Sequence, residues 1–382
     1  MLPFFVRSAV ADGVTVTPVR SAASRAAFVA LPYRLYRDDR LWVPPRRGDC
    51  RRRLSRRRNP FFDHADVALF LAHRGREVVG RIAAVHNHRP PQSHRDREGF
   101  FGQFECADDP EAAAALVRAA GDWLRGRGLV AMTGPVNFTT SDECGTLIEG
   151  FDLPPVVMSA YNPSYHAALL EGCGLVKAKD LYSWQWTADG NPLPDAISKI
   201  AQRAARGGVT VRPLELRDFR AEVARLRSLF NSTVSPLWGM QPFSDREFTD
   251  LATRLRPWAR PEFLLIAEVR GRPVGTLLAV PDVNRALAAA RGAPPVVRTA
   301  RALRAVRSID HGRVLALGVA AEYRLRGVEA ILVERLAAAG LGLGMRSAEI
   351  GWTLEDNTSV NRTIARLGCR RTKVHRLWRR DL

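Results

Sequence analysis

The chain contains the same run of sequence patterns twice, and this repeat constrains the fold more than any other feature. Gly13–Pro18 (GVTVTP) returns as Gly208–Pro213 (GVTVRP), 195 residues later (208 − 13). The turn at Arg74-Gly75 returns at Arg270-Gly271, at nearly the same offset. A third match keeps its spacing at a shift of 194 residues: Gly174, Lys179 and Trp184 return as Gly368, Lys373 and Trp378. Matches in one order at an almost constant offset indicate two copies of one domain.

The length and composition agree with two domains. A chain of 382 residues is long enough for two domains of ordinary size. We place the first copy at residues 14–188 and the second at residues 208–382, joined by a linker at 189–207 with room for a short helix. Hydrophobic residues make up 46% of the chain, so both copies can fill a core and global disorder is excluded.

Both copies show the pattern order β-α-β-β-β-α-β-α-β. In the second copy, a hairpin spans residues 263–280, a strand follows at 313–319, and a helix runs from Gly327 to about Leu341. This order predicts an α/β fold. Each copy is expected to form a mixed, mostly antiparallel, twisted sheet flanked by helices.

The chain is strongly basic, with a formal net charge of +19. Such a charge is compatible with a nucleic-acid or an anionic-membrane partner. No RNP, zinc-finger or helix-turn-helix pattern is present, so nucleic acid is the disfavoured partner. Arginine supplies nearly all of the excess, and a GC-rich genome would produce the same bias.

Two segments concentrate the arginines. Arg46–Arg58 contains eight arginines opposed only by Asp49. It can be a solvated loop, or it can contact an anion or a membrane. In the second segment, 284–307, arginines recur every third residue at Arg298, Arg301, Arg304 and Arg307. This basic amphipathic pattern is typical of a helix on an anionic membrane surface, but a helix that caps the domain would show it equally.

The pattern of the cysteines suggests a cytoplasmic location. The five cysteines are scattered and contain no C-x-x-C pair, which argues against disulfides and structural zinc. His86 and His88 have the spacing of metal ligands, but we find no acidic or cysteine partner near them in sequence and interpret them as loop residues. No stretch approaches the roughly 18 apolar residues of a membrane span. A peripheral contact at the inner face of the membrane is the alternative.

One segment of the second copy suggests an anion site. The strand Val314–Val319 leads to the turn Arg324-Leu-Arg-Gly327-Val328 and a helix. Such a turn directs unpaired backbone N–H groups, at the positive end of the helix dipole, towards an anion. The turn and the element order resemble the GNAT superfamily of acyl-CoA-dependent N-acyltransferases. The resemblance implies acyl-CoA as co-substrate, no permanently bound cofactor and no metal, with a CoA site formed by Leu317, Gly318, Val319, Arg324, Arg326, Gly327, Val328 and Asn357.

The sequence departs from the GNAT pattern at three places. Glu329 stands where the turn motif has a small residue, and Ile364 stands where many members have a tyrosine that acts as general acid. In the first copy, the corresponding helix begins with the acidic run 106–111, which is unfavourable for phosphate. The first copy is therefore expected to be non-catalytic.

A closer resemblance covers almost the whole chain. The strings at residues 134–138, 150–155, 161–163, 238–242 and 352–357 look like a bacterial tandem-GNAT family that includes the bacterial ceramide synthases. The resemblance implies transfer of an acyl group from CoA to a long-chain, sphingoid-type amine. The alternative is a degenerate GNAT pair that binds a ligand or a partner without catalysis. An apolar tunnel that ends at residues 317–319 would favour the enzyme. Strands that stay closed together there would favour the protein that binds without catalysis.

N-acylation needs a base, and three carboxylates are candidates. Glu349 and Glu355 lie on a late strand, where alternation puts them on one face with Gly351 and Thr353, opposite Ile350, Trp352 and Leu354. Apolar neighbours would raise the pKa of such a carboxylate, as a base requires. Asp282 in Pro-Asp-Val-Asn is the third candidate. The alternatives are exposed edge acids for the two glutamates and a turn-forming role for Asp282.

Overall fold

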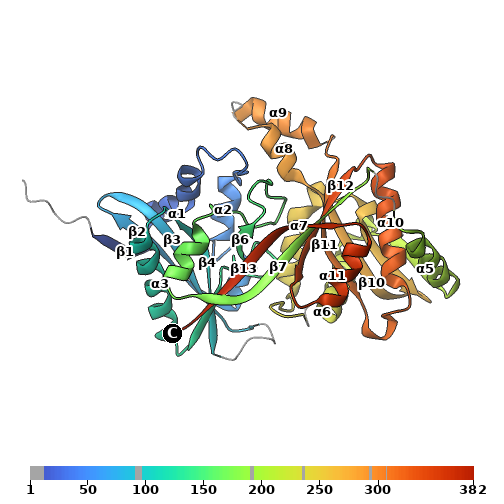
Figure 1. Cartoon of the computed structure of the whole chain (residues 1–382), viewed down its shortest axis with the longest axis horizontal. Coiled ribbons are helices and arrows are strands. Elements are labelled where there is room, and N and C mark those ends of the chain that lie inside the picture. The colour runs from blue at the N-terminus through green and yellow to red at the C-terminus, as the bar shows by residue number, and fades with distance from the viewer. Residues whose placement is uncertain (1–12, 91–96, 190–192, 235–236, 292–294, 307) are drawn as a thin grey trace, which may run out of the picture.

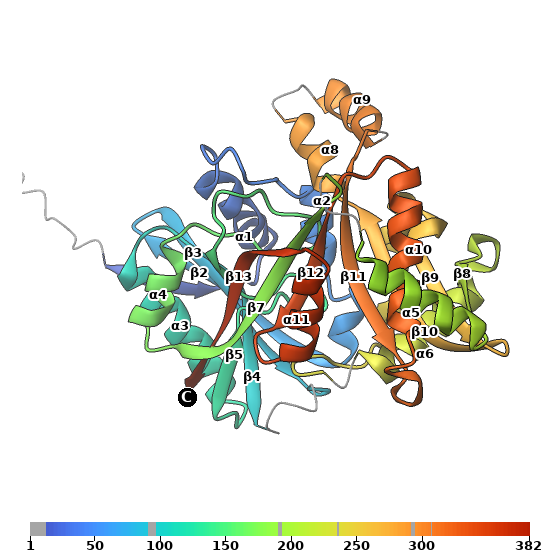
Figure 2. The same ribbon diagram turned by 45° about the vertical axis from the view of Figure 1, so that its right-hand side comes forward.

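One sheet runs through the whole molecule, and helices cover both of its faces (Figures 1 and 2). The computed structural model describes residues 13–90, 97–189, 193–234, 237–291, 295–306 and 308–382. Within these residues the strand order is β1-β2-β3-β4-β5-β13-β7-β12-β11-β10-β9-β8, and β6 pairs with β13. Most neighbouring strands are antiparallel, whereas β4–β5 and β11–β12 are parallel. The predicted fold class is confirmed.

The first copy has the expected order of elements, with α2 and β6 as additions. Its elements are β1 (Val14–Pro18), α1 (Ala22–Leu35), α2 (Arg47–Arg53), β2 (Ala65–Arg74), β3 (Glu77–Asn87), β4 (Glu98–Cys106), α3 (Pro110–Arg125), β5 (Ala131–Gly134), β6 (Thr146–Glu149), α4 (His166–Gly172) and β7 (Val176–Thr187).

The second copy follows a linker that forms the helix α5 (Asp195–Arg206); among the described residues it differs from the first copy by two added helices between its third and fourth strands and by the lack of a counterpart to β6. Its elements are β8 (Val209–Pro213), α6 (Phe219–Thr233), α7 (Asp245–Leu255), β9 (Leu264–Val269), β10 (Arg272–Pro281), α8 (Val283–Ala289), α9 (Pro295–Val306), β11 (His311–Val319), α10 (Val328–Gly342), β12 (Ser347–Leu354), α11 (Thr358–Arg366) and β13 (Arg370–Asp381). Short 3₁₀ turns connect several of them: Pro60–Asp63, Leu216–Asp218, Arg256–Trp258, Pro261–Phe263 and Ala321–Tyr323.

The two copies exchange their final strands. β13, the last strand of the second copy, lies between β5 and β7 of the first copy. β7, the last strand of the first copy, lies between β13 and β12. Because β7 and β13 pair antiparallel along most of their length, the sheet crosses the boundary between the copies without a break. The division at 188 and 208 describes the sequence repeat, and we propose it as the point of duplication.

Helices pack against both faces of this sheet. In the first copy, α3 and α4 bury one face, while α1 and residues around Phe61 bury the other. Adjacent residues of β2 show the alternation: Ala72 packs with α3, whereas Leu71 packs on the side of α1. In the second copy, α5 and α10 cover one face, and α6 and α7 cover the other. The helix α7 therefore lies on the side of the sheet where α1 and α2 also lie.

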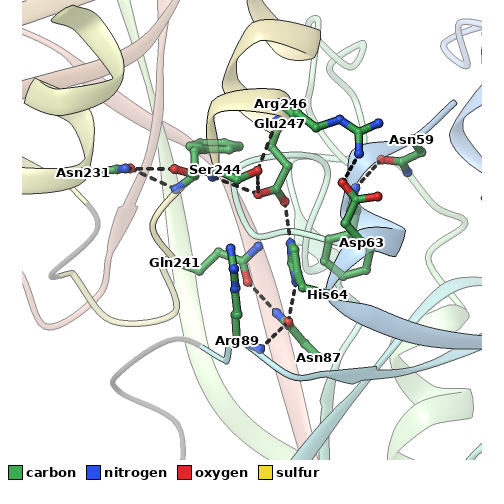
Figure 3. A network of polar contacts seen from close by, with 12 residues as sticks. Asn59, Asp63, His64, Asn87, Arg89, Asn231, Gln241, Ser244, Arg246 and Glu247 are labelled. Carbon is green, nitrogen blue, oxygen red and sulfur yellow. Dashed lines mark hydrogen bonds and ion pairs between the residues drawn. The ribbon is translucent and has the colours of Figure 1, made fainter. Parts of the chain in front are cut away.

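A buried polar network joins the copies on this side (Figure 3). His64 lies 2.9 Å from Glu247 of α7 through Nε2, and 2.9 Å from the Asn87 amide oxygen through Nδ1. Asn87 in turn donates to the Gln241 side chain. Glu247 also closes a capping box with Ser244 at the start of α7. The start of α7 is thereby fixed to the first copy.

Candidate active site

The two central strands of the second copy part from each other halfway along. β11 and β12 are paired in parallel only from His311 and Ser347 to Val314 and Ile350. On the other edge of β11, the pairing with β10 skips Leu315, which forms a β-bulge where the strands begin to part. β-Bulges are frequent beside active sites because they redirect the backbone. Beyond the bulge, β11 has a hydrogen-bonded neighbour among the described strands on the β10 side only.

The residues expected to hold the pantetheine arm lie on this free stretch of β11. Leu317 is 39% exposed, whereas Val319 is buried. Gly318 lies against the end of α6, and a Cβ atom at this position would overlap the Thr233 hydroxyl. Gly318 therefore permits the close approach of α6 to the strand.

The expected pyrophosphate turn leads from β11 to α10. Leu325 and Gly327 have positive φ angles of 60° and 81°, and no side chain caps the helix at Gly327. Arg324 donates through Nε to the Val319 carbonyl oxygen, 3.3 Å away, and the Arg326 guanidinium lies 5.4 Å from the Tyr323 ring centroid. The first N–H groups of α10, beginning at the buried Val328, are therefore free of side-chain caps and can bind an anion.

In the first copy, the same two places are occupied by the chain itself. The Val136 N–H donates to the Phe101 carbonyl oxygen over 2.7 Å, and the Gln103 N–H donates to the Asn137 side chain over 2.7 Å. The N-terminus of α3 is capped by Asp109, which also pairs with Arg74. Backbone groups that a pantetheine arm and a phosphate would use are already bonded there.

An apolar cavity of about 150 Å³ lies between the sheet and the helices α6 and α7. It reaches the parting strands at Leu315 and Ala316 of β11 and at Gly351 and Trp352 of β12. Its other walls are mostly aliphatic and aromatic: Met158, Leu214, Leu216, Phe219, Val223, Leu226, Phe230, Met240, Phe243, Phe248, Leu251, Ala252, Leu255, Ala259, Leu264, Leu278 and Val280. The polar residues that line it are Thr140, Ser141, Asp142, Arg256 and Arg313.

A second, larger cavity of about 640 Å³ lies mainly in the first copy, beneath α1 and α2. Its lining includes aromatic rings, among them Tyr33 and Trp42, the buried Arg81 and the partly buried Glu105. The two cavities share part of their walls, so they lie next to each other at the junction of the copies.

Glu349 is held in a buried ionic triad. Its carboxylate pairs with Arg313 of β11 and with the ammonium group of Lys373 of β13, 2.8 Å away. Burial by itself raises the pKa of Glu349, but Arg313 and Lys373 outweigh it, so that the pKa is lowered. A carboxylate held ionised by two cations is a poor proton acceptor, and Glu349 serves to join three strands.

The other expected site residues are engaged in structural contacts. Glu355 pairs with Lys177 at 2.5 Å and accepts from the Asp180 N–H. Asp282 caps α8 and accepts from the Val157 N–H over 2.8 Å, and burial raises its pKa. Asn357 caps α11 through the Val360 N–H.

The expected alternation along β12 is wrong. The pairing of β12 with β7 shifts between Ile350 and Thr353, which marks a bulge. Ile350 packs with Trp184, and the Trp184 indole donates to Thr353, so these two residues contact the same ring. Trp352 instead lines the apolar cavity. A bulge shifts the alternation of side chains between the two faces by one residue, and no local sequence pattern predicts this bulge.

Both arginine-rich segments are described in part, and a membrane contact of either one stays a prediction. In the first arginine-rich segment, Arg52 pairs with Asp250 and Arg53 pairs with Asp142 and Glu143, so these arginines bind within the protein. In the second, α9 projects beside α8 at the top of Figures 1 and 2, and Arg307 lies outside the described residues.

The histidine pair does have an acidic partner. Asp66, from the neighbouring strand β2, lies 3.2 Å from the His88 ring, and the ligand atoms of Asp66, His86 and His88 all lie within 4.8 Å of one another. Their separation in sequence hid this contact.

No helix in the described part of the chain is both long and apolar enough to cross a bilayer.

Comparison with known proteins supplies the family. A bacterial ceramide synthase from Caulobacter vibrioides is 32% identical over 376 residues, covering 97% of this chain and 98% of the relative. Protein YghO from Escherichia coli is 31% identical, covering 93% of this chain and 92% of the relative. No family model matches the chain. This chain is a member of the tandem-GNAT acyltransferase family.

Solved structures agree on the tandem-GNAT fold. A tandem GNAT protein from the clavulanic acid biosynthesis pathway aligns over 96% of this chain and 98% of its own, with a TM-score of 0.56 and 13% identity. A GCN5-related N-acetyltransferase from Sphaerobacter thermophilus aligns over 96% of this chain and 95% of its own, with a TM-score of 0.51 and 15% identity. At such low identity, these likenesses concern the tandem-GNAT fold alone.

Proposed function

We propose that this acyltransferase uses acyl-CoA to acylate the amine of a long-chain, sphingoid-type acceptor, and that its second copy alone binds acyl-CoA. The main support is the contrast between the copies. In the second copy the strands part beside an apolar cavity, whereas in the first copy the chain itself bridges the gap. The name of the Caulobacter vibrioides relative, a ceramide synthase, supports the long-chain acceptor.

The CoA arm would extend from the α10 turn to the parting strands. The uncapped N-terminus of α10 and the side chains of Arg324 and Arg326 would bind the pyrophosphate. The backbone of Leu317–Val319 would hold the pantetheine and donate to the oxyanion of the tetrahedral intermediate. The acyl chain would enter the apolar cavity, where burial of each CH₂ group contributes about 0.8 kcal/mol.

The leaving group needs little help. Ile364, at the position of the usual tyrosine acid, is buried against Trp184 and cannot donate a proton. A thiol with a pKa of about 8.5 leaves as a thiolate, so a general acid is dispensable. The amine, in contrast, must lose a proton before it attacks.

We also propose that the protein contacts an anionic lipid surface. Arg46, Arg47 and Arg51 at α2 are exposed, and so are Arg301 and Arg304 of α9. Arg291, after α8, donates to the carbonyl oxygens of Asp39 and Trp42, so the chain that precedes α9 contacts the chain that precedes α2. The exposed arginines of both elements would attract anionic head groups, each basic residue contributing about 1 kcal/mol near the surface.

The proposal is tested by measuring thiol release from acetyl-, butyryl- and palmitoyl-CoA with sphinganine as acceptor. We expect release with palmitoyl-CoA. Ala259→Trp, which fills the apolar cavity, should reduce release from palmitoyl-CoA much more than release from acetyl-CoA. Ala338→Trp on the exposed face of α10 is the matched control.

A different outcome would favour the second candidate, a GNAT pair without catalysis. Absence of release with every donor, together with no thermal shift on adding acyl-CoA, would sink the enzyme proposal. An equal loss of thiol release from acetyl-, butyryl- and palmitoyl-CoA in Ala259→Trp would contradict the placement of the acyl chain in the apolar cavity.

A further inference from the structure

One carboxylate stands between the two cavities. Six described residues line both of them, and they are mostly apolar or neutral: Ser141, Asp142, Met158, Phe243, Leu251 and Leu255. Asp142 is the ionisable member of this set, and its side chain is 14% exposed. An acyl chain in the apolar cavity and an acceptor in the larger cavity would therefore meet at Asp142.

The charges around Asp142 leave room for one more cation. Arg53 donates to Asp142 Oδ1 over 2.6 Å and to the neighbouring Glu143 over 3.1 Å. One guanidinium is thus shared by two carboxylates. The nearby Arg254 pairs with Asp250, which also pairs with Arg52. The Glu143 backbone N–H also bonds the Asp142 carboxylate, but among the described residues no side chain donates to Asp142 Oδ2, so this oxygen can accept from a bound ammonium group.

The larger cavity independently shows signs of a ligand site. The Nε of Arg81 and the Nε2 of Gln103 are buried there without a hydrogen-bond partner in the described structure. Arg81 is 9% exposed. Buried donors without partners are costly in a folded protein. Both donors would be satisfied by a ligand that presents hydroxyl or carbonyl oxygens.

We infer that the larger cavity receives the amine acceptor and that Asp142 is the base that takes the proton from its ammonium group. This inference rests on the proposed function. The ammonium transfers one proton to Asp142, and the freed nitrogen lone pair attacks the thioester carbon to form the C–N bond. Collapse breaks the C–S bond; the remaining excess proton on nitrogen passes to the thiolate, and Asp142 returns its proton to solvent.

The electrostatic surroundings suit this role. Burial, the largest effect, and the charge of Glu143 raise the pKa of Asp142. Arg53 from α2, Arg254 from α7 and a hydrogen bond from the Glu143 backbone N–H oppose the rise, and the net shift in this pKa is upward. A raised pKa makes a carboxylate a better proton acceptor near neutral pH. Glu349, by contrast, has its pKa lowered by its two cations.

The test is the pH dependence of thiol release from palmitoyl-CoA with sphinganine, using the full-length chain. We expect Asp142→Asn to lower kcat by about 10²-fold at pH 7. The deficit should shrink towards high pH, because solvent then supplies the free amine. The affinity for palmitoyl-CoA should stay unchanged. Asp142→Glu, which keeps a carboxylate, should restore the wild-type pH profile.

Glu143→Gln is the matched control, since Glu143 shares Arg53 but lines the larger cavity only. Whatever its rate, it should keep a carboxylate-dependent pH profile, moved to lower pH because Glu143 no longer raises the pKa of Asp142. A wild-type rate and profile in Asp142→Asn would overturn the inference, and so would equal, pH-independent losses in both variants. Failure of the wild-type chain to bind palmitoyl-CoA would instead refute the proposed function, on which this inference depends.

Discussion

At the scale of single residues, Glu349 shows what a local pattern misses. The apolar neighbours in sequence predict a raised pKa, but the structure adds Arg313, 36 residues away, and Lys373, 24 residues away. Both cations come from other strands, so no local window contains them. The turn at Gly327 is different, because it is formed by consecutive residues; the structure shows it without a side-chain cap, and its binding of CoA stays a prediction.

Glu349→Gln should destabilise the protein by about 3–5 kcal/mol at neutral pH, because it leaves two buried cations without their anion. The lowered pKa of Glu349 means that its contribution is present above the ordinary glutamate pKa and is lost as the pH falls through the folded-state value. The deficit of the variant, measured by urea unfolding, should therefore shrink in acid. A constant deficit from pH 7 to pH 3 would contradict this account.

At the scale of elements, the position of α7 depends on a contact between the copies. The capping box at Ser244 and Glu247 is readable in the sequence. The contact between Glu247 and His64 cannot be read from the sequence, because the two residues are 183 positions apart. Both ring nitrogens of His64 face acceptors, the Glu247 carboxylate and the Asn87 amide oxygen, and only the doubly protonated ring can donate to both (Figure 3).

This contact predicts a loss of stability as the pH rises. Burial lowers the pKa of His64, but the bonds to Glu247 and Asn87 outweigh burial and the nearby Arg89, so the net pKa is raised. Its contribution is fully present below about 6.5 and is lost as the pH rises through the folded-state pKa. The free energy of unfolding should fall by about 1–2 kcal/mol more in the wild type than in His64→Gln between pH 6 and pH 9. Parallel pH curves would count against the contact.

At the scale of the whole molecule, the duplication in the sequence predicts two copies of one fold, and the sheet bears this out. The exchange of β7 and β13 could not be predicted, because a repeat reads the same whether its last strand pairs within its own copy or with the other. The closure of the first copy at Val136 and Asn137 is equally hidden, although the acids before α3 already indicated an unfavourable phosphate site.

The strand exchange predicts that the copies stay together after the linker is cut. With a protease site introduced between residues 189 and 193, cleavage should leave both fragments in one complex, since β13 still lies between β5 and β7. Size-exclusion chromatography at micromolar concentration measures this. Two separate, folded fragments would refute the exchange.

The central claim is that one acyl-CoA site exists per chain, in the second copy. Isothermal titration of the protein with palmitoyl-CoA, below its micelle concentration, tests this claim most directly. The structure predicts one site, which Arg324→Glu combined with Arg326→Glu removes without changing the fold, because both side chains are exposed. Two sites per chain, or one site that survives in this double variant, would contradict the claim.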